Sequence, residues 1–133
     1  MSATRAFTFK KEERLCSKTL IDRLFNGGKS HSLAAFPMRV VYLEQDREEG
    51  KAQVQVLISV PKRCFKLAVK RNRVKRQIRE AYRQQKHSLL DALQEKPNRM
   101  ILLAFIWLDN QLHASDEVYQ KVGNLLIRIG EKV

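Results

Sequence analysis

The sequence predicts an α+β domain in which helices pack on a small β-sheet. Three observations support this fold class. Two strand-like segments lie in the first half of the chain, a nine-residue apolar run lies in the second half, and a segment without Gly or Pro that is rich in helix-forming residues separates them. The 133 residues, of which 44% are hydrophobic, suffice for one buried core. We therefore expect residues 1–133 to form a single domain.

The beginning of the chain is expected to hold an extended arm and one short helix. Residues 1–14 are polar and basic, and we expect them to run extended. Ser17 can then cap a helix, and Gly27-Gly28 can end it because glycine adopts the positive φ that a helix end favours. Apolar residues recur on one face of this helix, namely Leu20, Ile21, Leu24 and Phe25. The helix therefore has one apolar side.

Two strands are expected next. Residues 36–43 are rich in β-branched and aromatic types, and residues 52–60 alternate apolar with polar side chains, which is typical of a strand with one buried face. The polar segment 45–50 lies between them as a turn, so the two strands are predicted to pair as an antiparallel hairpin. Pro61 ends the pairing because it has no N–H to donate.

The segment after Pro61 predicts a long basic helix, since the chain contains no further Gly or Pro until Pro97. Apolar residues at helical spacing form a narrow stripe, namely Leu67, Val74, Ile78, Ala81 and Tyr82. Residues 89–93 continue a weaker helical pattern that Pro97 ends. The stripe should dock the helix on the core and leave its other sides to solvent.

The last two elements are a buried strand and a closing helix. Residues 100–108 form a continuous apolar run, which predicts a strand buried on both faces at the centre of the sheet. Ser115 can cap the helix, with Asp116 and Glu117 in the first turn, where the helix dipole favours acids. Its apolar face comprises Val118, Val122, Leu125, Leu126 and Ile129. The order helix, strand, strand, helix, strand, helix is that of a two-layer domain.

The positive charge of the chain is concentrated in one segment. Of a formal net charge of +12, residues 62–83 carry +9, from ten basic residues and one acid, Glu80. The other 111 residues carry only +3. A solvated helix face usually mixes charges of both signs, whereas ten like charges in 22 residues repel one another unless a polyanion neutralises them. This segment is therefore predicted to bind phosphates, and nucleic acid is favoured over an anionic membrane surface.

No catalytic or metal-binding constellation is evident in the sequence. The acids at positions 44–49 lie on the predicted turn, where a solvated role is the simpler interpretation. The three histidines occupy unrelated polar contexts, and Cys16 and Cys64 form no metal-ligand spacing, so both are expected to be reduced thiols. The chain has no run of 18 apolar residues and no apolar segment of signal-peptide kind near its start, so a cytoplasmic protein is expected. We expect neither catalytic residues nor a metal site on this chain.

The most specific pattern is residues 68–83, AVKRNRVKRQIREAYR, in which Asn72 stands between Arg71 and Arg73. This order of residues closely resembles the signature of the bacterial ribonuclease P protein family, whose basic helix carries Arg-Asn-Arg followed by Lys-Arg and Arg-Glu. The order of helices and strands is similar over nearly the whole chain. One departure lies in residues 62–67, where the family usually has a glycine and this chain has one residue more.

The resemblance implies a two-layer α/β sandwich with a left-handed β-α-β crossover, and a place for one additional strand before the basic helix. It also implies that the chain binds a large catalytic RNA and the 5′ leader of precursor tRNA, while the RNA, with Mg²⁺, hydrolyses the phosphodiester. The implied RNA-binding residues are Lys62, Arg63, Lys66, Lys70, Arg71, Asn72, Arg73, Lys75, Arg76, Arg79 and Arg83.

The resemblance further implies a leader-binding cleft between the first helix and one face of the sheet. Ile21 and Phe25 match the aromatic positions of the family's helix, although Ile21 cannot stack on a base as an aromatic ring does. On the strand, Arg39 with Val41 is favoured over the alternative pair, residues 38 and 40. Without the resemblance, ordinary core packing would be the simpler interpretation of Ile21 and Phe25.

Two other functions are compatible with a basic helix, namely DNA binding and structural RNA binding, and the sequence argues against only the first. A basic-zipper DNA-binding helix would need apolar residues at heptad spacing after its basic region, and Pro97 interrupts that pattern. DNA is therefore not expected as a partner, and neither is a membrane, since the charge pattern favours nucleic acid. A ribosomal or other structural RNA-binding protein without a processing role remains the alternative that the composition allows equally well.

Overall fold

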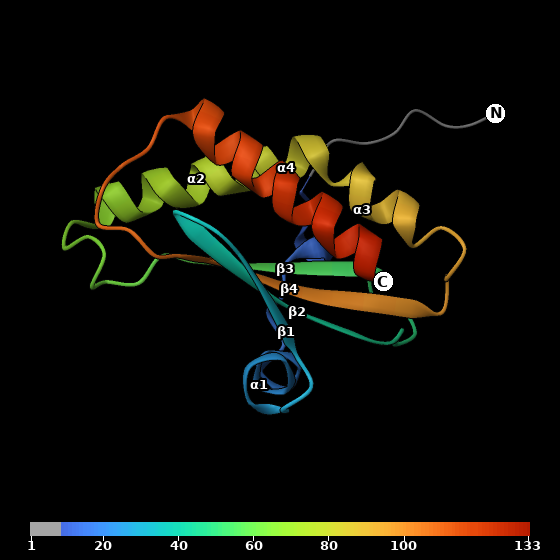
Figure 1. Cartoon of the computed structure of the whole chain (residues 1–133). Helices are drawn as coiled ribbons and strands as arrows, with labels where there is room; N and C mark the ends of the chain where they lie inside the picture. The colour runs from blue at the N-terminus through green and yellow to red at the C-terminus, as the bar shows by residue number, and fades with distance from the viewer. Residues whose placement is uncertain (1–8) are drawn as a thin grey trace.

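The computed structural model describes residues 9–133, so the part of the predicted arm that precedes residue 9 lies outside the described residues. The elements in chain order are η1 (Lys11–Glu13), α1 (Lys18–Asn26), β1 (His31–Ala35), β2 (Met38–Asp46), β3 (Val54–Ser59), α2 (Ala68–Gln85), α3 (His87–Ala92), β4 (Arg99–Trp107) and α4 (Ser115–Lys132). Figure 1 shows α2, α3 and α4 on one face of the sheet and α1 on the other. The predicted α+β class is confirmed.

The sheet has the strand order β1-β2-β4-β3. β4 pairs antiparallel with β2 and parallel with β3, and residues 100–107 are all buried, which confirms the predicted central strand. The predicted hairpin between residues 36–43 and 52–60 is wrong, because β4 lies between β2 and β3. A strand that is apolar on both faces gains most when it has a neighbour on each side. The parallel pairing of β3 and β4 is made possible by the crossover through α2 and α3.

The antiparallel partner of β2 is β1, which the sequence pattern did not identify. β1 is an edge strand whose side chains are exposed or half-buried, so it lacks the apolar alternation by which strands are found. The connection to β2 is the two-residue turn Phe36-Pro37, whose peptide bond is cis. β1 supplies a third strand before the basic helix, but it precedes the two predicted strands and does not follow them.

Two apolar clusters lie on opposite faces of the sheet. The larger one joins alternate residues of β2, β3 and β4 to the buried faces of α2, α3 and α4, and the smaller one joins the remaining residues of β2 and β4 to α1. Each face of β2 and β4 is therefore covered by a different helical layer. This division places the two predicted binding regions on opposite sides of the sheet.

The prediction that residues 1–14 run extended is wrong for part of the described segment. Residues Lys11–Glu13 form the 3₁₀ helix η1, and Arg14 then bridges in parallel with Val56. The Leu15 N–H donates to the Val56 carbonyl at 2.9 Å. Glu13 forms an ion pair with the buried Lys86 at 2.5 Å. The segment thereby covers the edge of β3, whose backbone groups would otherwise be unpaired.

Two predictions at helix ends are wrong, although the helices themselves are confirmed. Leu67 is the N-cap residue of α2 and is 58% exposed, so it does not belong to the buried stripe. The N-cap of α4 is Ala114, and Ser115 caps nothing with its side chain. Instead, the Ser115 hydroxyl accepts a hydrogen bond from Gln77 Nε2 at 3.0 Å, which joins α4 to α2.

Candidate nucleic-acid interface

Helix α2 is attached to the core by one stripe of side chains. The buried residues are Val74, Ile78, Ala81 and Tyr82, and they pack in the larger apolar cluster. The spacing of these residues keeps them on one side of the helix, so the charged side chains are directed elsewhere. The helix therefore presents its basic residues from a rigid support.

Most of the predicted phosphate-binding cations have no partner within the part of the chain that the structure describes. Among residues 9–133, eight of them make no side-chain hydrogen bond or ion pair, namely Lys62, Arg63, Lys66, Lys70, Arg73, Lys75, Arg76 and Arg79. All of these except the half-buried Lys75 are exposed, as is Asn72. Asn72, Arg76 and Arg79 recur at spacings of three and four, so they share one helix face. Unpaired cations on a common surface favour binding of a polyanion.

Arg71 differs from its neighbours because its guanidinium supports the loop before the helix. Its Nη1 donates to the carbonyl oxygens of Phe65 at 2.7 Å and Lys66 at 3.0 Å. These bonds tie the basic loop 62–67 to the first turn of α2. Sequence reasoning grouped Arg71 with the other cations, since nothing in the order of residues signals a contact with backbone carbonyls.

Arg83, at the other end of the helix, is paired with the one acid of the segment. Its Nε and Nη2 donate to the Glu80 carboxylate, the shortest contact being 2.6 Å between Nη2 and Oε2. This bond lowers the pKa of Glu80 and raises the pKa of Arg83. The cations with no partner therefore lie mainly in the loop and in the first two-thirds of α2.

Helix α1 forms as its sequence predicts and fixes the second candidate region. The Ser17 side chain accepts a hydrogen bond from the Leu20 N–H at 3.3 Å. Leu20 and Leu24 are buried against the sheet, whereas Ile21 is half-buried and Phe25 is 42% exposed. Ile21 therefore packs at the edge of the smaller apolar cluster, and Phe25, one helical turn later, presents its ring to solvent.

The strand residues of the predicted cleft lie on the same face of the sheet as α1. Val41 is 8% exposed and packs in the smaller apolar cluster with Leu20 and Leu24. Arg39, two residues earlier on the same face, donates from Nη1 to Ser32 Oγ at 3.4 Å. The alternative pair, Met38 and Val40, is fully buried beneath the other helices and cannot line a cleft on this side.

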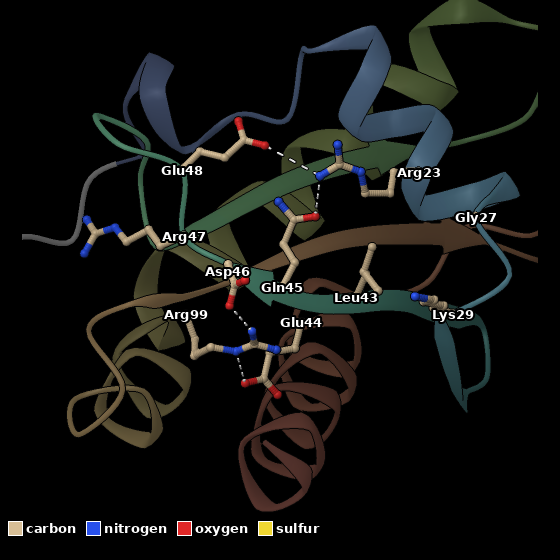
Figure 2. Close-up of a pocket in the computed structure, with 10 residues that line it drawn as sticks. All are labelled: Arg23, Gly27, Lys29, Leu43, Glu44, Gln45, Asp46, Arg47, Glu48 and Arg99. Carbon is tan, nitrogen blue, oxygen red and sulfur yellow. Dashed lines mark hydrogen bonds and ion pairs between the residues drawn. The ribbon is translucent and has the colours of Figure 1, made fainter.

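A cavity of about 510 Å³ lies beside α1, but none of the predicted cleft residues lines it. Figure 2 shows two ion-pair groups in its wall. Arg23 contacts Glu48 at 3.6 Å, and Arg99 contacts Glu44 at 3.0 Å and Asp46 at 2.5 Å. Two of the acids that the sequence assigned to a solvated turn, Glu44 and Asp46, lie on β2 and pair with Arg99 of β4, whereas Glu48 follows β2 and pairs with Arg23 of α1. These acids offset the charges of Arg23 and Arg99, so this cavity is less suited to phosphates than α2 is.

Other chemical groups are sparse. Within residues 9–133, no group of three His, Cys, Asp or Glu side chains is placed to hold a metal ion. Cys16 is exposed and Cys64 is buried, and both are free thiols. None of the helices in the described part of the chain is long and apolar enough to cross a membrane.

A small α+β domain whose basic helix carries cations with no partner among residues 9–133 is typical of nucleic-acid-binding proteins, and comparisons with known proteins identify the family. The family model described as Ribonuclease P matches residues 9–129. The ribonuclease P protein component of Porphyromonas gingivalis is 39% identical over the whole chain and 94% of that protein, and the one from Dictyoglomus thermophilum is 31% identical over 95% of the chain and 92% of that protein.

Two solved structures share the fold. The ribonuclease P protein from Thermotoga maritima superimposes with a TM-score of 0.61 at 24% identity, covering 87% of this chain and 96% of that one. The ribonuclease P protein from Staphylococcus aureus superimposes with a TM-score of 0.53 at 21% identity, covering 90% of this chain and 94% of that one. The chain belongs to the ribonuclease P protein family, the protein components of a ribonucleoprotein endoribonuclease of tRNA processing. The resemblance found in the signature is thereby confirmed.

Proposed function

We propose that this chain acts in the cytoplasm by binding the catalytic RNA of ribonuclease P through loop 62–67 and α2, and the 5′ leader of precursor tRNA through α1 and the adjacent sheet face. The observation that carries the proposal is that one segment of a chain of this family holds eight cations without a partner among the described residues. Phosphate neutralisation by such cations releases counterions and supplies affinity. The Arg71 bonds to the loop support the proposal because they hold the loop cations beside the helix.

The leader-binding part of the proposal rests on the arrangement around α1. The half-exposed ring of Phe25 offers a surface on which a base could stack, and Arg39 supplies a cation on the same side of the sheet. Val41 is nearly buried, so its role would be to form the apolar floor beneath the nucleotide. Ile21 would add apolar contact without stacking.

The contribution of the chain to cleavage would be positioning. Mg²⁺ ions held by the catalytic RNA would supply the hydrolytic chemistry. The protein would hold the RNA through α2 and the leader through α1, on opposite faces of one rigid sheet. Its cations would also reduce the repulsion between two polyanions, an effect that matters most where Mg²⁺ is scarce.

The deciding experiment measures cleavage of precursor tRNA at low Mg²⁺ with three mixtures: the catalytic RNA alone, the protein alone, and both. We expect strong cleavage only with both, and none with the protein alone. A protein that binds RNA but fails to improve cleavage by any bacterial ribonuclease P RNA would contradict the proposal and favour a structural RNA-binding role.

A further inference from the structure

An exposed aromatic ring stands at the turn between β1 and β2. Phe36 is 61% exposed, the largest exposure of any aromatic side chain among residues 9–133. Its ring lies edge-on to His113, with 6.2 Å between ring centroids and 76° between planes. The Leu108 N–H, just after β4, donates to the Pro37 carbonyl at 2.8 Å. The turn is therefore fixed to the end of β4, and one side of the Phe36 ring is supported while the rest faces solvent.

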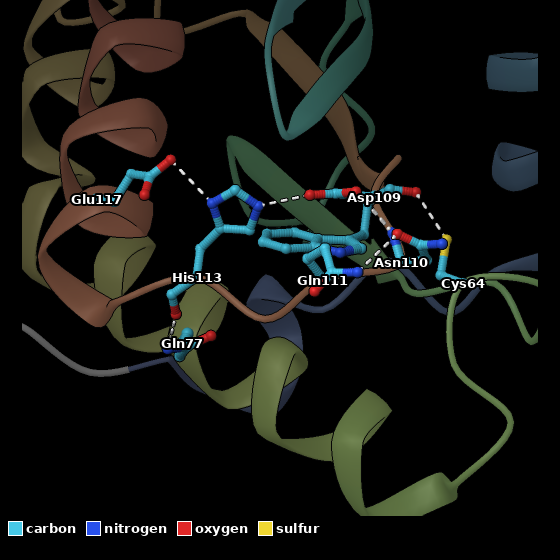
Figure 3. A network of polar contacts seen from close by, with 8 residues as sticks. Cys64, Gln77, Asp109, Asn110, Gln111, His113 and Glu117 are labelled. Carbon is cyan, nitrogen blue, oxygen red and sulfur yellow. Dashed lines mark hydrogen bonds and ion pairs between the residues drawn. The ribbon is translucent and has the colours of Figure 1, made fainter.

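The support for this ring is itself rigid. Figure 3 shows His113 held between Asp109 and Glu117. Its Nε2 lies 2.7 Å from Asp109 Oδ2, and its Nδ1 lies 2.9 Å from Glu117 Oε2. Trp107 packs edge-on to the same imidazole at 5.4 Å. The carboxylates favour the imidazolium, so the pKa of His113 is raised and that of Asp109 is lowered. An aromatic side chain that is supported in this way loses little conformational freedom when a ligand covers it.

The ring is continuous with the proposed RNA interface. Gln77 of α2 donates from Nε2 to the His113 carbonyl at 3.0 Å. Arg73 lies one helical turn before Gln77 on the same side of α2. The buried Cys64 approaches the Trp107 carbonyl at 3.7 Å, which brings the basic loop 62–67 to the same end of β4. Phe36 and the unpaired cations thus border one end of the molecule.

We propose that Phe36 is a stacking platform for an unpaired base of the catalytic RNA, an inference that rests on the proposed function. An exposed aromatic face beside a cationic surface suits single-stranded nucleic acid, because cations contact phosphates while the ring contacts a base. The His113 group carries a net charge near −1 when the imidazole is protonated, which disfavours a phosphate at that point but not a neutral base. The catalytic RNA is the partner because Gln77 of α2 holds the His113 carbonyl, and α2 packs on the face of the sheet opposite the proposed leader cleft.

The test compares the affinities of three Phe36 variants and one control variant for the catalytic RNA. Phe36→Ala and Phe36→Leu should each weaken binding about 5- to 150-fold, since a base stacked on an aromatic ring contributes on that order, and Leu keeps apolar surface without a ring face. Phe36→Trp should restore binding. The dependence of affinity on salt should stay unchanged in all three, because no charge is removed. The control is Ile127→Ala, which removes an exposed apolar side chain elsewhere in the protein, on α4. This variant should bind as the unaltered protein does.

A fluorescence measurement identifies the base contact directly. Trp107 is the sole tryptophan and is fully buried, so the Phe36→Trp variant adds one exposed indole whose emission a stacked base should quench. Quenching by the catalytic RNA is expected. Quenching only by precursor tRNA with its leader would overturn the assignment of the partner, and affinity of Phe36→Leu equal to that of the unaltered protein would overturn the stacking role. Failure of the unaltered protein to bind the RNA at all would instead contradict the proposed function.

Discussion

Two arginines of one motif have different environments, and their substitution should have different consequences. Arg71 donates to two loop carbonyls, whereas Arg73 has no partner among residues 9–133. Arg73→Ala should weaken binding of the catalytic RNA and reduce the slope of log affinity against log salt by about one, without changing stability. Arg71→Ala should in addition lower the free energy of unfolding by about 1 kcal/mol through the lost charged hydrogen bonds.

Binding titrations over a range of salt and urea unfolding of both variants check this difference. Lys132→Ala, which removes a cation at the far end of α4, is the matched control and should change neither quantity appreciably. An unchanged salt slope for Arg73→Ala would mean that this side chain contacts no phosphate. Equal stability of the two variants would contradict the role assigned to the Arg71 bonds.

His113 should make stability depend on pH. Its bonds to Asp109 and Glu117 raise its pKa above the ordinary value of 6.5. Because the folded pKa is the higher one, this contribution is fully present below pH 6.5 and is lost as pH rises through the folded pKa. We therefore expect the free energy of unfolding to fall as pH rises from 6.5 through the folded pKa of His113, and His113→Gln to flatten that dependence.

Urea unfolding at several pH values within this window measures the effect. His31→Gln is the control, since His31 is an exposed residue of β1 and is not held between carboxylates. The lowered pKa of Asp109 acts at the acidic end, where its contribution is lost as pH falls through the folded pKa, so the two effects are separable. A slope that persists unchanged in His113→Gln would assign the pH dependence to other groups.

At the scale of elements, the spacing of apolar residues predicted the helices and strands whose buried face can be identified from their own sequence. α2, α4 and β4 have apolar residues at spacings that only one type of element can bury, and the structure has all three close to the expected bounds. The wrong hairpin has a different origin. The choice of partner for β2 depends on β4, which lies more than 50 residues further along the chain, and no local pattern encodes that competition. β1 was missed because an exposed edge strand has no apolar face to detect.

The segment around η1 gives a prediction at this scale. Lys86 is 5% exposed and pairs with Glu13, whose carboxylate thereby fixes η1 to the C-terminal end of α2. Glu13→Gln should destabilise the fold by on the order of 3 kcal/mol, because it leaves the ammonium buried with weaker compensation. Combining it with Lys86→Met should recover part of that loss. Hydrogen exchange at the Leu15 amide, which bonds to Val56, should accelerate in the single variant.

Unfolding measurements on the two single variants and on the double variant test the coupling. Glu12→Gln, an exposed neighbour in the same 3₁₀ helix, is the matched control and should leave both stability and exchange unchanged. Additive effects of the two changes would show that the Glu13–Lys86 contact contributes no coupling energy.

At the scale of the whole molecule, the distribution of charged residues along the sequence predicted the candidate interface. It did not predict which charged side chains form ion pairs within the protein. The concentration of cations in residues 62–83 is a property of the sequence and survives folding, since most of these side chains have no partner in the described range 9–133. The contacts of Arg23 and Arg99 with Glu48, Glu44 and Asp46 require segments distant in sequence to meet, so the sequence alone could not distinguish them from solvated charges.

The division of the molecule by its sheet predicts two energetically independent binding regions. Phe25 lies with α1 on one face and Arg73 on α2 over the other, and they share no partner. Phe25→Ala should weaken the binding of precursor tRNA that carries a leader. It should leave the binding of mature tRNA and of the catalytic RNA unchanged. In precursor cleavage at limiting protein, the double variant Phe25→Ala with Arg73→Ala should show the sum of the two single effects within about 0.5 kcal/mol, as distant sites do. A coupling energy of more than about 1 kcal/mol would mean that leader and catalytic RNA meet on the protein, and that the sheet does not separate them.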